Sequence, residues 1–131
     1  MTNQLNHFES KLSFEIDSSD LFEAIERGEK IIPVDARKRA GFETEHIPGA
    51  INIPHREMNE GTTALLDKNS VYAVYCDGVG CNASTKGAYH MTRLGFRVRE
   101  LIGGIASWIS YEYATEGTNA NPTGKKINCD C

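Results

Sequence analysis

The stretch that decides the fold spans residues 71–86 and reads VYAVYCDGVGCNASTK. Its first five residues are apolar and rich in β-branched and aromatic side chains, which is typical of a buried strand. This strand pattern stops at Cys76, and a loop of small residues with two glycines follows. Apolar residues then recur at helical spacing, so we predict a helix that begins near Asn82 or Ser84. A strand, a cysteine, a loop and a helix N-terminus therefore follow one another directly.

Cys76 is the candidate nucleophile of this stretch. The first amides of a helix have no partner within it and carry the positive end of its dipole. A cysteine beside them ionises more easily, and the thiolate is the reactive form. We therefore predict that Cys76 is catalytic rather than a buried structural cysteine, and that the loop amides bind its anionic substrate. The candidate binding residues are Asp77, Gly78, Val79, Gly80, Cys81 and Asn82.

The remaining sequence predicts strands that alternate with helices. Strands are expected at residues 14–16, 31–34, 52–53, 71–75 and 96–101; helices are expected at 20–28, at 82–94 and from 105, with short helical turns in 55–66. This alternation predicts a three-layer α/β fold, with a mostly parallel sheet covered by helices on both faces. Residues 1–13 are expected to be a loose lead-in, 14–115 the folded domain, and 116–131 a flexible polar tail.

The whole chain has the length and charge of a single cytoplasmic domain. Its 131 residues can form one hydrophobic core. A formal net charge of −4 gives no reason to expect nucleic acid as a partner. There is neither an apolar run that could cross a membrane nor a signal-peptide pattern, so we expect a cytoplasmic protein without a membrane partner. In that compartment Cys76, Cys81, Cys129 and Cys131 are expected to be thiols or metal ligands rather than structural disulfides.

Two charged residues are expected beside Cys76. Ligands of parallel sheets bind at the carboxyl ends of the strands, where the pattern places Asp35 and Arg37. A carboxylate and a guanidinium can fix a loop through charge-assisted hydrogen bonds, and we favour this structural role, although Arg37 can also lend positive charge to the site. His46 is expected to hold a tight turn rather than to move protons, and Trp108 is expected in the core.

With these residues placed, the chain resembles single-domain rhodaneses. The segment VDARKRAGFETEHIPGAINIP resembles the first signature of that family, and the strand that ends in Tyr75-Cys76 resembles its active-site strand. The segment LGFRVRELIGGIASW resembles the closing part of the family pattern. The resemblance implies an α/β fold and a sulfurtransferase activity in which the loop cysteine carries sulfur as a persulfide.

The active-site loop departs from the usual family pattern, Cys-x-x-Gly-x-Arg-Ser. No arginine stands between Cys76 and Ser84, the serine comes later than usual, and Asp77 and Cys81 occupy loop positions. Glu45 also stands where the family usually has glycine. The resemblance therefore implies the fold but not the sulfur donor. Because Asp77 is anionic, we expect the dianion thiosulfate to be a poorer donor than a persulfide.

The resulting prediction is a sulfurtransferase without metal or organic cofactor. Cys76 takes sulfur from a small-molecule or protein donor and passes it to a thiol or cyanide acceptor. One alternative is a non-catalytic sulfur-carrying, sensing or interaction module. A phosphatase or arsenate reductase is disfavoured, because the loops of such enzymes end in an arginine that clamps the anion.

The other cysteines allow several roles. Cys81 could close a disulfide with Cys76 as a resolving thiol, relay a persulfide, or only fill space. A zinc site made by Cys76 and Cys81 is not expected from their spacing. Cys129 and Cys131 are favoured as part of an ordinary tail over a soft-metal or sulfur-accepting site. The oligomeric state is left open.

Overall fold

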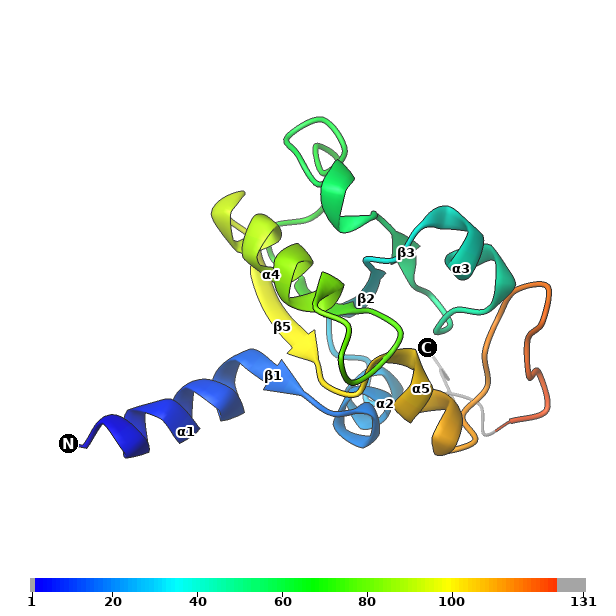
Figure 1. Ribbon diagram of the computed structural model, residues 1–131, viewed down its shortest axis with the longest axis horizontal. Coiled ribbons are helices and arrows are strands. Elements are labelled where there is room, and N and C mark those ends of the chain that lie inside the picture. Colours follow the sequence, from blue (N-terminus) through cyan, green and yellow to red (C-terminus); the bar gives the residue numbers. More distant parts are fainter. Residues whose placement is uncertain (1, 125–131) are drawn as a thin grey trace.

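A computed structural model describes residues 2–124 of the chain (Figure 1). Five strands form one all-parallel sheet in the order β1–β5–β4–β2–β3. The strands are β1 (Glu15–Ile16), β2 (Ile31–Asp35), β3 (Ile51–Asn52), β4 (Val71–Tyr75) and β5 (Arg97–Leu101). The predicted strand that leads to Cys76 is therefore the central one.

Helices cover both faces of this sheet. They are α1 (Asn3–Phe14), α2 (Ser18–Glu26), α3 (Arg39–Thr44), the short 3-10 helix η1 (His55–Glu57), α4 (Ala83–Arg93) and α5 (Gly104–Ser110). Side chains of α2 and α5 form the core on one face, and α4 contributes to the core on the other. This arrangement confirms the three-layer α/β prediction. None of the helices within residues 2–124 is long and apolar enough to cross a bilayer.

The central strand β4 contributes side chains to both cores. Ala73 and Tyr75 pack with Trp108 on one face, whereas Tyr72 and Val74 pack on the other. This alternation explains the continuous apolar run, because a strand covered on both faces has no solvated side.

Pro33 lies inside β2 at a position where its missing N–H is tolerated. The Ala36 amide donates to Tyr75 in β4, whereas the Asp35 carbonyl accepts from Ile53 on the β3 side. Successive residues of a parallel strand alternate between the two neighbours, so Pro33 faces the β3 side together with Asp35. On that side pairing begins only at Val34, which is paired with Ile51. The ladder therefore loses no hydrogen bond.

The N-terminal residues correct the sequence-based expectation. Residues 3–14 form the helix α1 and not an irregular lead-in, so the predicted strand at 14–16 shortens to Glu15–Ile16. The side chain of Thr2 caps the helix by accepting from the Leu5 amide, and Lys11 pairs with Glu15 at 3.0 Å. No residue of α1 is buried, so the helix rests mainly on these local interactions, together with a hydrogen bond of 2.9 Å from Arg99 in β5 to the Leu12 carbonyl.

The beginning of the predicted tail is also ordered. His46 and Glu116 exchange two backbone hydrogen bonds of 2.8 and 2.9 Å, and the Asn119 amide donates to Thr44 at 2.8 Å. A Cβ on Gly117 would lie 2.6 Å from the Thr44 carbonyl oxygen. The expectation of a flexible segment from residue 116 is therefore wrong for 116–119, which contact the carboxyl end of α3 (Figure 1).

Candidate active site

Cys76 lies directly after β4, at the carboxyl edge of the sheet, and is 3% exposed. The first turn of α5 holds the backbone around it. The Ile105 amide donates to the Cys76 carbonyl at 3.0 Å, and the Ala106 amide donates to the Asp77 carbonyl at 2.9 Å. A Cβ on Gly104 would lie 2.5 Å from the Cys76 oxygen, and the φ of Gly104 is +57°. Glycine is thus required for this approach.

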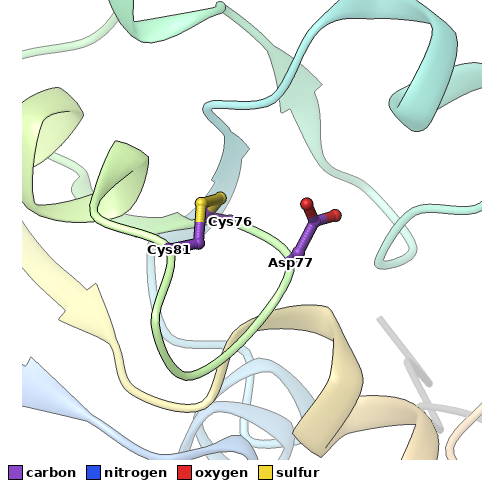
Figure 2. Close-up of side chains that lie close together, drawn as sticks. All are labelled: Cys76, Asp77 and Cys81. Atoms are coloured by element: carbon purple, nitrogen blue, oxygen red, sulfur yellow. A yellow bond between two sulfur atoms is a disulfide. The ribbon is translucent and has the colours of Figure 1, made fainter.

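The structure joins Cys76 and Cys81 in a disulfide, with a Cα–Cα distance of 6.4 Å (Figure 2). The loop returns on itself because the Cys81 amide donates to the Gly78 carbonyl at 3.2 Å and Gly80 adopts a φ of +93°. The compartment alone favoured thiols or metal ligands, but this disulfide is one of the roles that the sequence left open for Cys81. The compartment indicates only how often cysteines form disulfides, whereas the glycines of this loop let the chain turn so that Cys81 reaches Cys76.

A cleft of about 470 Å³ opens beside the two cysteines. Its walls come from the β2–α3 connection, α3, η1 with the residue before it, the cysteine loop and the start of α4. They are Ala36, Arg37, Lys38, Gly41, Pro54, His55, Arg56, Glu57, Cys76, Asp77, Cys81 and Ala83. A hollow of this size suits a small molecule.

Arg37 is held between two carboxylates. Its guanidinium contacts the fully buried Asp35 at 2.7 Å and the exposed Asp77 at 3.3 Å, and it also donates to the Glu45 carbonyl at 2.6 Å. Burial by itself would lower the pKa of Arg37, but the hydrogen bond to Asp35 and the charge of Asp35 outweigh it, so the pKa is raised. Arg37 therefore fixes the loop and has its charge compensated, which agrees with the structural role that the sequence favoured.

Two cations of the cleft were missed by the sequence analysis. Lys38 and Arg56 line the cleft with exposed side chains, and neither forms an ion pair within residues 2–124. His55 beside them has a lowered pKa, because it is partly desolvated and lies near the positive charges of Lys86 and Arg56. The sequence held one signal for these residues. Lys38 lies inside the segment 34–54 on which the family resemblance rests, and His55 and Arg56 follow it directly. The cleft thus carries these cations as well as two carboxylates, those of Asp77 and Glu57.

The predicted binding residues are divided between different surroundings. Asp77 and Cys81 line the cleft with Cys76. Gly78, Val79 and Gly80 line a second hollow of about 230 Å³ next to the end of β5, to which Cys76 and Cys81 also contribute. Asn82 is the N-cap residue of α4 and lines neither. The Cys81 amide is already bonded to Gly78, so it is the least available of the proposed anion-binding amides.

The other residues singled out in the sequence are structural. Trp108 is fully buried and donates to the Ala114 carbonyl at 3.0 Å, which confirms its place in the core. His46 stacks on Phe42 with a centroid distance of 3.9 Å, and it does not line the cleft.

One group of potential metal ligands lies at the site. The ligand atoms of Cys76, Asp77 and Cys81 lie within 4.8 Å of one another. With both sulfurs in a disulfide, no thiolate is available to bind a metal. That the protein holds no metal stays a prediction. Cys129 and Cys131, the other candidate ligands, lie outside the described residues.

Comparisons with known proteins give a consistent result. Residues 18–111 match the family model of the rhodanese-like domain. Thiosulfate sulfurtransferase PspE of Escherichia coli is 34% identical over 73 residues, which cover 55% of this chain and 68% of PspE. Thiosulfate sulfurtransferase GlpE of Coxiella burnetii is 31% identical over 93 residues, which cover 70% of this chain and 82% of GlpE. The crystal structure of BH2092 from Bacillus halodurans superposes with a TM-score of 0.86 and 42% identity, covering 96% of this chain and 93% of that protein.

Proposed function

Because the chain belongs to the family of rhodanese-like domains, we propose that it is a sulfurtransferase that carries sulfane sulfur as a persulfide on Cys76. The observation that carries this proposal is the position of Cys76 at the end of the central strand, against a cleft of about 470 Å³ and before the N-terminus of α4. The names of the relatives PspE and GlpE support the reaction class, since both are thiosulfate sulfurtransferases.

The reaction begins from the reduced form of the loop. The Cys76 thiolate attacks the outer sulfur of the donor, the donor's own bond to that sulfur breaks, and the rest of the donor leaves with the electron pair. A thiol or cyanide then attacks the outer sulfur of the persulfide and regenerates the Cys76 thiolate. Because the two half-reactions share one covalent intermediate, ping-pong kinetics are expected.

The charges of the cleft act on the donor in opposite directions. Lys38 and Arg56 attract an anionic donor, because their charges are free within the described residues. Asp77 repels the same anion close to Cys76, and Glu57 adds a second negative charge to the wall. The charge of Arg37 is compensated by Asp35 and Asp77. We propose that an anionic donor enters the cleft but that thiosulfate reacts more slowly than a persulfide at the sulfur itself.

The phosphatase and arsenate reductase alternative lacks support. No arginine lies between Cys76 and Ser84, and the Arg37 guanidinium is already bound by two carboxylates. A tetrahedral anion would need a free guanidinium at the loop for bidentate binding.

Mass spectrometry of the intact, pre-reduced protein tests the proposal. After exposure to thiosulfate, glutathione persulfide or cysteine persulfide, we expect Cys81→Ser, which keeps Cys76 but lacks the second thiol of the loop, to gain the mass of one sulfur atom, whereas Cys76→Ser gains none. Addition of cyanide should return the original mass and give thiocyanate over many turnovers. Loading without turnover would identify a sulfur carrier, and loading of Cys76→Ser would exclude Cys76 as the site.

A further inference from the structure

We propose that Cys81 is a resolving cysteine, which releases the sulfur carried on Cys76 as hydrogen sulfide and gives the protein a second, reductive activity. The inference rests on the proposed persulfide. It starts from the disulfide, which places the Cys81 Sγ in bonding contact with the Cys76 Sγ (Figure 2). In a persulfide on Cys76, this same Sγ is the inner sulfur.

The step is a thiol–disulfide exchange within the loop. The Cys81 thiolate attacks the Cys76 Sγ, and the bond between that Sγ and the outer sulfur breaks. The outer sulfur leaves with the electron pair, and with the proton of the persulfide, as hydrosulfide. The Cys76–Cys81 disulfide forms at the same time. Two thiols are thereby oxidised to a disulfide, and one sulfane sulfur is reduced to sulfide.

The shape of the loop favours attack on the inner sulfur. Gly80, at a φ of +93°, and the bond from the Cys81 amide to Gly78 turn the chain back toward Cys76. A relay would require the Cys81 sulfur to lie one bond further out, next to the outer sulfur of the persulfide. The described loop instead closes on Cys76 itself, so release of sulfide is preferred over relay.

The disulfide that this step leaves is open to an external reductant. Cys81 is partly exposed and lines the cleft, whereas Cys76 is 3% exposed. A dithiol reductant can therefore attack Cys81, displace the Cys76 thiolate, and then release Cys81 by closing its own disulfide. The two electrons of the dithiol thus restore the reduced loop, and the cycle becomes catalytic.

A single-turnover experiment tests this activity in the full chain. Pre-reduced protein is freed of reductant and mixed with one equivalent of glutathione persulfide, and released sulfide and intact mass are followed together. The wild type should release one sulfide per chain and end two hydrogen atoms lighter than its reduced form. Cys81→Ser should keep the mass of one added sulfur atom and release at least tenfold less sulfide. The same comparison in a Cys129→Ser/Cys131→Ser background removes the tail thiols.

The outcomes separate this inference from the function on which it rests. If the wild type keeps the added sulfur atom on Cys76, or if Cys81→Ser releases sulfide equally fast, Cys81 is not the resolving thiol. In either case transfer from Cys76 to cyanide would still support the proposed function. If neither protein takes up sulfur from any donor, the proposed function itself fails. Transfer of the Cys76 sulfur to cyanide by Cys81→Ser should persist, because cyanide attacks the outer sulfur without Cys81.

Discussion

The cysteine loop and the N-terminal helix α1 obtain their structure in opposite ways. The loop, residues 76–82, is held by distant parts of the chain: its carbonyls accept from the first turn of α5, and Asp77 pairs with Arg37. Helix α1 has a local cap and a local ion pair, and none of its residues is buried. The site therefore depends on tertiary contacts that a sequence window cannot contain, whereas α1 has mainly local contacts and a hydrogen bond of 2.9 Å from Arg99 to the Leu12 carbonyl near its end.

Among the substitutions at the cysteine loop, removal of Arg37 should lower the free energy of unfolding most. Arg37→Met leaves the fully buried Asp35 without its partner, so we expect the free energy of unfolding to fall by about 3 kcal/mol. Denaturant unfolding measures this change. The double variant Asp35→Asn/Arg37→Met removes the unpaired charge and should recover part of the loss. Equal stability of the single and double variants would mean that the ion pair does not support the loop.

The contact between α5 and the loop can be broken at Gly104. An alanine there would place its Cβ 2.5 Å from the Cys76 carbonyl oxygen, at a φ of +57°. We expect Gly104→Ala to lower the free energy of unfolding by about 2 kcal/mol and to slow sulfur loading of Cys76.

Gly28→Ala is the matched control for that clash. Gly28 has a φ of +78° but nothing within 4 Å of the added Cβ, so only the backbone conformation is strained. Gly28→Ala should lower the free energy of unfolding by about 1 kcal/mol and leave sulfur loading of Cys76 unchanged. If Gly28→Ala slowed loading as much as Gly104→Ala, the approach of α5 would not be what positions Cys76.

Changing the charge of Asp77 tests the electrostatics of the cysteine loop while leaving the contacts of the loop with α5 in place. The Asp77 carboxylate lies within 4.8 Å of both sulfurs. Two like unit charges about 5 Å apart at an effective dielectric constant near 20 repel by about 3 kcal/mol. Asp77 is 74% exposed, so solvent reduces this repulsion. About 1 kcal/mol would remain, or about fivefold in rate.

We therefore expect Asp77→Asn to raise the second-order rate constant with thiosulfate about fivefold, and Asp77→Arg to raise it further. The rate constant with glutathione persulfide should change less. Stopped-flow measurement of the first half-reaction gives both values. A wild type that already favours thiosulfate, or equal changes for both donors, would refute the electrostatic argument.

Substitutions in α1 should have the smallest effect. Leu12→Ala removes a side chain that is 78% exposed, so stability should change by less than about 0.5 kcal/mol. The matched change Leu21→Ala leaves a cavity at a fully buried position in α2 and should lower the free energy of unfolding by about 3 kcal/mol. A loss at Leu12 comparable to that at Leu21 would show that α1 packs against a partner in solution.

Most secondary structure could be predicted from the sequence, because it has local causes. The apolar run of β4 lies where its pattern indicated, and the helix expected at 20–28 is α2, which begins two residues earlier at Ser18 after an Asp17 cap. Helix α1 had the same kind of signal: Leu5, Phe8 and Leu12 recur at helical spacing after a Thr2 cap. The polar residues between them make this stretch resemble an irregular segment, although its periodicity is helical.

What the sequence by itself determined is the order of the elements and the place of Cys76 at the end of a buried strand, since both follow from periodicity over a few residues. Only the tertiary structure decided that Cys81 lies against Cys76, that Arg37 is held by two carboxylates, and that Lys38 and Arg56 line the cleft. The physical reason is that side-chain chemistry at the site depends on distances in space. Those distances are set by the packing of β2, η1, α4 and α5 around one sheet edge, and residue spacing along the chain does not encode them directly.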